Sequence, residues 1–153
     1  MSDHPTIDLS RTPVRQLSVF LENRVGAMMS LVRLLREHQI EVLGLALQEA
    51  TELTILRMVL SDPEGAEALF CERGIPHADS RIVVVEIREG SQDLTHCLSA
   101  LLQAEINIRS SYPLMNRPSL GALLALHLDD AEVGETALHT SGFKVMCQNE
   151  LSR

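Results

Sequence analysis

The spacing of apolar residues predicts alternating strands and helices in the first half of the chain. Residues 14–21 have a strand period, with Leu17, Val19 and Leu21 on one face. Residues 27–38 place apolar side chains three and four positions apart, which indicates an amphipathic helix. The other expected elements are strands at 40–50 and 53–60, a helix from Asp62-Pro63 to Gly74, and an edge strand at 75–79 that contains Pro76.

The second half repeats this β-α-β-β-α-β order. Met28, Leu31, Val32 and Leu35 recur at a constant offset as Leu94, Cys97, Leu98 and Leu101. The expected elements of this half are strands at 81–87, from Ile106, at 120–128 and at 143–147, with a second helix between Asp129-Asp130 and Gly142. The pattern predicts an α+β chain of two ferredoxin-like modules at 13–79 and 80–153, preceded by a polar lead-in at 1–12. Each module has a four-stranded antiparallel sheet with two helices on one face, and side by side the two form a continuous eight-stranded sheet.

Two of the expected strands are apolar on both faces. In residues 120–128, Leu123 and Ala125 lie opposite Leu124 and Leu126, and residues 40–47 are similar. A sheet with one solvated face normally alternates apolar and polar residues. We therefore expect another sheet to cover the open face in a homodimer. The alternative is that these are central strands with a modestly apolar open face.

Composition excludes several classes of protein. The 153 residues carry a net charge of −8 and only 3% aromatic residues, which argues against binding of nucleic acid. The three cysteines show no CxxC spacing, which favours a reduced cytoplasmic setting, and no apolar run is long enough to span a membrane. The first residues also lack the apolar segment of a secretion signal.

The segment between the first strand and the first helix has the chemistry of a small-ligand site. Gly26 allows close approach of the backbone, and the first N–H groups of the helix, near Gly26, Ala27 and Met28, can bind a carboxylate. The Asn23 carboxamide can pair with an ammonium or a carboxylate. A free amino acid needs both kinds of partner. The alternative is that Asn23 caps the helix and Gly26 only makes the turn.

Two stretches, QLSVFLENRVGAMMSLVRLL and LLQAEINIRSSY, together with the duplicated order, resemble the ACT domains of amino-acid metabolism. The resemblance covers about residues 14–151. In that family an Asp/Asn-x-Pro-Gly loop binds an effector amino acid at the seam between two modules, and the Asn of a Gly-x-Asn-Ile motif in the neighbouring module completes the site. The resemblance therefore implies an amino-acid ligand at the seam.

Mapped onto the family, the two repeats differ. The first keeps Asn23 and Gly26, has Val25 in place of Pro, and has Glu41 at the position of the seam Asn. The second loses the loop motif in 89–92 but keeps Asn107. The resemblance thus implies one site per chain and two per homodimer. Its expected residues are Asn23, Arg24, Val25, Gly26, Ala27, Met28 and Asn107.

Other residues suggest packing more than chemistry. The histidines lack metal-site spacing, and we expect His127 to be half-buried and Cys97 to lie in the core. Met28 and Met29 are expected in the core, with one of them as a possible ligand contact, and Tyr112 either at the seam or in a surface belt. No catalytic constellation and no phosphate loop are found, so we expect no cofactor, no metal and no enzymatic activity.

Three functions remain open at this stage. The first is an allosteric regulatory protein that binds a free amino acid at the seam and acts on a partner such as an amino-acid biosynthetic enzyme. The second is an oligomerisation or regulatory subunit whose ligand site has decayed, which Val25 would favour. The third is an enzyme on a ferredoxin-like scaffold, which lacks a convergent acid–base set.

Overall fold

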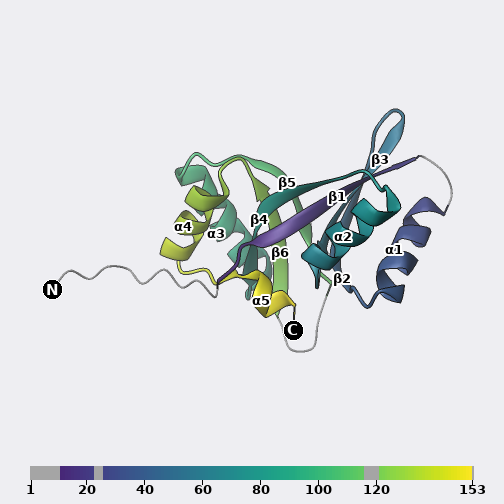
Figure 1. The fold of residues 1–153 in the computed structure, drawn as a ribbon. Helices are drawn as coiled ribbons and strands as arrows, with labels where there is room; N and C mark the ends of the chain where they lie inside the picture. Colours follow the sequence, from purple (N-terminus) through teal and green to yellow (C-terminus); the bar gives the residue numbers. More distant parts are fainter. Residues whose placement is uncertain (1–10, 23–25, 116–120, 153) are drawn as a thin grey trace.

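The computed structural model describes residues 11–22, 26–115 and 121–152 (Figure 1). The first half contains β1 (Val14–Glu22), α1 (Ala27–Glu37), β2 (Val42–Glu49), β3 (Leu53–Leu60) and α2 (Pro63–Arg73). The second half contains β4 (His77–Ile87), α3 (Gly90–Gln103), β5 (Ile108–Pro113), β6 (Ala122–Leu128), α4 (Ala131–Thr140), β7 (Val145–Met146) and α5 (Gln148–Leu151). The duplicated order predicted from the sequence is confirmed.

The long strand β4 belongs to both modules. Residues 77–82 pair with β1, whereas residues 83–87 pair with β6, and β7 pairs with β4 at Val84 and Val85. The described strands form a seven-stranded antiparallel sheet in the order β2-β3-β1-β4-β6-β5, with β7 beside β4. The predicted continuous eight-stranded sheet is therefore wrong, because two expected strands, at 75–79 and 81–87, are one. The predicted module boundary between residues 79 and 80 falls inside β4.

Each half buries an apolar layer between its strands and its helices. In the first half Leu17 and Val19 of β1 pack with Leu31 and Leu35 of α1 and with Phe70 of α2. In the second half Val83 and Val85 of β4 pack with Cys97 and Leu101 of α3 and with Leu138 of α4. The alternation read from the sequence thus identified the faces that meet the helices. None of the helices in the described ranges combines the length and apolar character needed to cross a bilayer.

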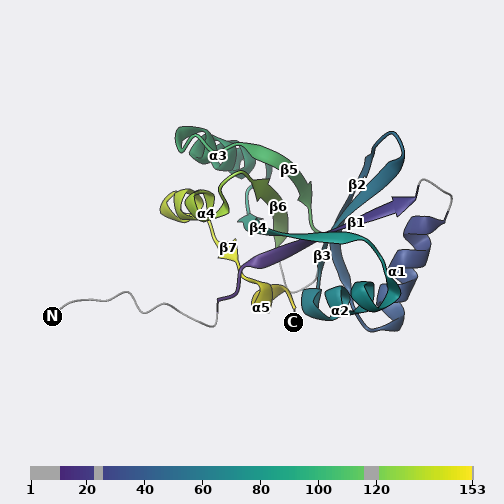
Figure 2. The same cartoon turned by 45° about the horizontal axis from the view of Figure 1, so that its top comes forward.

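The opposite faces of the two halves pack against each other. A third group of buried residues, here called the central cluster, joins them: Val14, Leu43, Val59, Ile82, Val84, Tyr112, Leu114, Leu123, Ala125, Met146 and Leu151. The Met115 N–H donates to the Leu43 carbonyl at 2.8 Å, so β2 and the end of β5 meet here, and the two strands diverge from this point (Figure 2). The two-sided apolar strands are thus covered within one chain. They no longer argue for a homodimer, which stays a prediction.

The helix ends follow the expected signals. The Asp62 and Asp130 side chains accept from the N–H groups of Gly65 and Val133 and cap α2 and α4. Gly74 ends α2 with a left-handed φ of 65°. The short α5 was not expected from the sequence, and its Leu151 extends the central cluster from the C-terminal end.

Candidate functional site

The N-terminus of α1 is open to a ligand. Gly26 precedes the helix with φ 86°, a left-handed conformation that favours glycine, and no side chain among the described residues caps this end. The first turn carries no acidic residue. The backbone N–H groups of Ala27, Met28 and Met29 therefore lie at the positive end of the helix, and no side chain in the described ranges accepts from them. The predicted site residues Asn23, Arg24 and Val25 lie outside the described residues.

A cavity of about 550 Å³ adjoins this helix end. Its walls come from the end of β1, from α1, and from the segment between α2 and β4: Phe20, Leu21, Glu22, Ala27, Ser30, Leu31, Leu34, Gly74, Ile75 and Pro76. All of these residues belong to the first half of the chain. The cavity offers apolar side chains together with one exposed carboxylate, Glu22. Sequence reasoning did not include Glu22, although it ends the strand that leads into the loop.

The equivalent loop of the second half is closed by its own carboxylate. The N–H groups of Arg88 and Glu89 donate to Asp93 Oδ2 at 2.9 and 3.0 Å. Asp93 aligns with Ala27 when the two repeats are superposed in sequence, so the repeat that lacks the loop motif has a carboxylate where the first repeat has a methyl group. An approaching ligand carboxylate would meet Asp93 and be repelled. The two loops therefore differ in their access to anions.

Asn107 lies far from the α1 cavity. Its N–H donates to Asp129 Oδ1 and its side-chain amide to Asp129 Oδ2, both at 3.2 Å. Glu41 makes the corresponding backbone contact, donating to Ser61 Oγ at 2.8 Å, so Glu41 and Asn107 occupy equivalent positions. The connection between α3 and β5 and the start of α1 lie on opposite sides of the molecule (Figures 1 and 2). One chain thus does not bring Asn107 to the start of α1.

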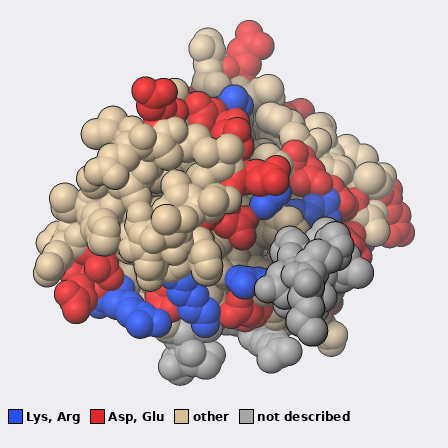
Figure 3. Space-filling model, turned by 90° about the vertical axis from the view of Figure 1, so that its left-hand side faces the viewer, with Lys and Arg blue, Asp and Glu red and all other residues tan. Residues whose placement is uncertain are grey.

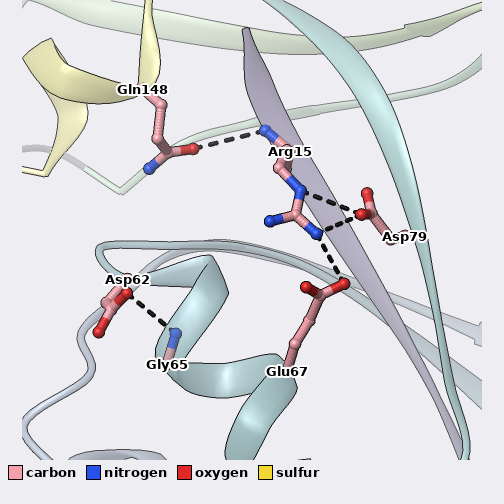
Figure 4. Close-up of polar contacts among 6 residues, drawn as sticks. All are labelled: Arg15, Asp62, Gly65, Glu67, Asp79 and Gln148. Atoms are coloured by element: carbon pink, nitrogen blue, oxygen red, sulfur yellow. Dashed lines mark hydrogen bonds and ion pairs between the residues drawn. The ribbon is translucent and has the colours of Figure 1, made fainter. Parts of the chain in front are cut away.

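A polar junction holds the two halves together on another side. The guanidinium of Arg15 in β1 pairs with Asp79 of β4 and, at 2.6 Å, with Glu67 of α2 (Figure 4). The backbone N–H of Arg15 donates to Gln148 Oε1 of α5 at 3.4 Å. Hydrogen bonds to Asp79 and then Glu67 raise the pKa of Arg15. A cavity of about 610 Å³ lies beside it. Because two carboxylates already engage the guanidinium, this cluster connects elements and offers no free cation to a ligand.

The remaining predicted residues have mixed outcomes. Cys97 is fully buried, and burial, followed by the charge of Asp93, raises its pKa to about 11, so the thiol stays protonated. His127 is half-buried as expected.

Met28 and Met29 are 39% and 64% exposed, so the prediction that they lie in the core is wrong. Both precede Leu31, the first residue of α1 that faces the sheet. Within the described residues no three His, Cys, Asp or Glu side chains are grouped to hold a metal.

Comparison with known proteins connects this architecture to a family. Residues 12–152 match the family model described as an ACT domain pair, whereas a comparison with curated proteins found no match. A solved structure, protein BT0572 from Bacteroides thetaiotaomicron, is similar with a TM-score of 0.84 and 20% identity, covering 94% of this chain and 98% of that one. The ligand-free regulatory subunit of aspartate kinase from Thermus thermophilus is similar with a TM-score of 0.57 and 13% identity, covering 88% and 95% of the two chains. Because the family model spans nearly the whole sequence, the protein belongs to the ACT domain pair family.

Proposed function

We propose that the protein is a cytoplasmic regulatory protein that binds a free amino acid and acts allosterically on a partner, such as an amino-acid biosynthetic enzyme, without catalysing a reaction itself. ACT domain pairs are typical of ligand-binding regulatory proteins in amino-acid metabolism. One similar structure is a regulatory subunit of aspartate kinase, which agrees with such a role. The observation that carries the proposal is the N-terminus of α1, which no described side chain caps, beside a cavity of about 550 Å³.

In this proposal each part of an amino acid has a partner. The ligand carboxylate accepts from the N–H groups of Ala27, Met28 and Met29, helped by the helix dipole. The ammonium lies near the carboxylate of Glu22, and the Asn23 carboxamide, with Arg24 and Val25, completes the loop. The ligand side chain packs against the apolar wall that includes Leu34 and Ile75. An ammonium-to-carboxylate contact is charge-assisted, and such contacts are worth about 1.5–3 kcal/mol.

The closed second loop supports one site per chain. Asp93 accepts from the N–H groups of Arg88 and Glu89 and so places a carboxylate beside the start of α3, where it would repel a second ligand carboxylate. Exchanging the residues at the two equivalent positions is therefore the most direct experiment. Ala27→Asp supplies the first loop with a carboxylate, and Asp93→Ala removes it from the second.

The test is a thermal-shift screen of the twenty amino acids followed by calorimetry. A ligand at about 100 times its Kd stabilises the folded state by about 2.7 kcal/mol. We expect one amino acid to raise the melting temperature of the wild type, Ala27→Asp to abolish binding, and Asp93→Ala to leave affinity at the first site unchanged. If no amino acid stabilises the protein, the alternative is favoured: an oligomerisation or regulatory subunit with a decayed site. Turnover of a bound metabolite by the purified protein would contradict the non-enzymatic role.

Asn107 enters this site only if a second copy supplies it. Since one chain keeps Asn107 beside Asp129, we propose that the family-type seam forms between two protomers of a homodimer. Asn107→Ala should then lower affinity, roughly ten- to a hundred-fold for the loss of a charge-assisted contact. The same substitution in a protein that stays monomeric at saturating ligand should have no effect. Unchanged affinity in a ligand-bound dimer would remove Asn107 from the site.

The outer face of α3 offers an apolar surface for a second kind of dimer, since α3 and the start of α1 lie on opposite sides of the molecule (Figures 1 and 2). Leu94, Leu98 and Leu102 are 38%, 42% and 76% exposed and recur at every fourth position of the helix. The side of the molecule that carries α3 and α4 shows a broad area without charged residues (Figure 3). Contiguous exposed apolar area of this kind often marks a protein contact. A homodimer through this face would leave the start of α1 away from the contact, so it is an alternative to the seam that would bring Asn107 to α1 of the other protomer.

A further inference from the structure

The module interface becomes polar at one end. Four polar residues lie two positions away from interface residues along their strands, and therefore on the same face. Arg57 and Ser110 precede Val59 and Tyr112, and His127 and Gln48 follow Ala125 and Ala46. Since the central cluster lies between the two halves, these four side chains face the space where the halves separate. β2 and β5 diverge in this direction in Figure 2.

A β-bulge brings a second arginine to the same end. The pairing of β5 with β6 shifts between Ile108 and Ser110, so Arg109 is the extra residue. The pairing of β2 with β3 shifts in the same way between Val42 and Gly44, so Leu43 is the equivalent residue of the first repeat. Leu43 is buried in the central cluster beside the end of β5. The two bulges thus place leucine where the halves meet and arginine where they diverge.

This polar end has hydrogen-bonding groups without protein partners. Within the described residues, the buried side-chain atoms that lack a partner are Ser110 Oγ and His127 Nδ1, and these two residues are directly paired across β5 and β6. Arg57 donates to Gln48 Oε1, yet neither Arg57 nor Arg109 forms an ion pair in the part of the chain described. Buried polar groups are normally satisfied.

The electrostatics of His127 agree with this arrangement. Its pKa is lowered first by burial and then by the positive charges of Arg109 and Arg57. Those two arginines, on β5 and β3, are the charged groups that act on the ring, and Tyr112 beside them stays neutral because burial raises its pKa. An anion between the arginines would reverse the effect on His127, since it would stabilise the imidazolium.

We propose that this end of the module interface binds a small oxyanion, a carboxylate or phosphate group, between Arg57 and Arg109, with donors from His127 and Ser110. Guanidinium groups bind both classes of oxyanion through paired N–H donors. The site joins β3 of one half to β5 and β6 of the other, so its occupation favours the packed arrangement of the two halves. It is separate from the cavity at α1 and does not depend on the amino-acid proposal.

Calorimetry of the whole protein with sulfate and with acetate, at constant ionic strength set by chloride, tests this site. Sulfate represents a phosphate group, and acetate a carboxylate. We expect saturable one-to-one binding of at least one of them, tighter at about pH 6 than at about pH 8 as His127 gains a proton. Comparison of the two ions shows which class the site prefers.

Variants with a matched control complete the experiment. Arg109→Leu introduces the residue that the equivalent bulge already carries, so it should fold, and it should weaken binding roughly ten- to a hundred-fold. Arg88→Leu removes another exposed arginine, one that pairs with Glu86, and should leave binding unchanged. NMR titration should show that the pKa of His127 rises when the preferred ion is present. Absence of saturable binding by both ions, or equal weakening by Arg109→Leu and Arg88→Leu, would overturn the proposal.

Discussion

A buried hydrogen bond across the module interface should stabilise the packing of the two halves. Tyr112 of β5 donates its hydroxyl to Gln16 Oε1 of β1 at 2.7 Å, and the two residues are 5% and 0% exposed. Gln16 also donates to Ser80 Oγ at 3.3 Å. In Tyr112→Phe the Gln16 oxygen stays buried without this donor, which costs about 1–3 kcal/mol. Gln16→Met should cost a similar amount, because the tyrosine hydroxyl is then left unpaired.

The double variant separates the hydrogen bond from its two groups. When both polar partners are removed, no buried group is left over from this bond, so the loss should be smaller than the sum of the single losses. We expect a coupling energy of about 1–2 kcal/mol, measured by urea unfolding followed by circular dichroism, with an unchanged m-value.

The control pairs Tyr112→Phe with Arg73→Ala at the exposed end of α2, where the two losses should add. If Gln16→Met and Tyr112→Phe also add to within about 0.5 kcal/mol, the hydrogen bond does not stabilise the interface and our reasoning about it is wrong.

Three further predictions concern the same architecture. Gly44→Ala should destabilise the protein by about 1–3 kcal/mol in urea, because its Cβ would lie 2.4 Å from Leu114 Cδ2 and 3.3 Å from Leu114 Cα; an unchanged midpoint would show that β5 moves away freely. Without added oxyanion, the free energy of unfolding should fall as the pH falls below about 6.5, because His127 binds a proton more readily in the unfolded state. If the free energy of unfolding of His127→Gln falls as steeply with pH as that of the wild type, this prediction is wrong. Leu98→Lys should shift any dimer toward monomer in sedimentation, and an unaffected dimer would exclude the α3 face.

Periodicity and capping predicted most of the elements because their causes are local. Leu17 and Val19 alternate with polar residues, and Asp62-Pro63 marks a helix start whether or not the rest of the chain is known. The merged strand β4 was missed for a physical reason. Pro76 precedes the strand, and Asp79, Ser80 and Arg81 are polar because that part of β4 is exposed, not because the chain turns. No local signal separates an exposed strand segment from a turn of the same composition.

The sequence could not show which sheet covers the apolar open faces of the strands. Apolar residues such as Leu123 and Ala125 show that something covers a strand, but not whether the covering sheet belongs to the same chain. The answer depends on how β4 passes from one half to the other, which is a long-range property. The same strand explains why Asn107 lies far from the start of α1. Pairing of both halves along β4 gives a geometry that differs from the side-by-side seam assumed from the family resemblance.

The differences between equivalent positions make the two halves unequal in their polar contacts and charge. Ala27 leaves one helix end open, whereas Asp93 closes the region before the other helix. At the bulges, Leu43 joins the halves through apolar contact, whereas Arg109 places a cation where they diverge. The constant offset between the repeats, visible in the sequence, could have revealed both pairs. The bare sequence could not have shown that Asp93 accepts hydrogen bonds from its own loop, or that Arg109 and Arg57, from different halves, both lower the pKa of His127. A duplicated fold therefore offers two versions of each position, and in our proposals only one version of each pair binds an anion.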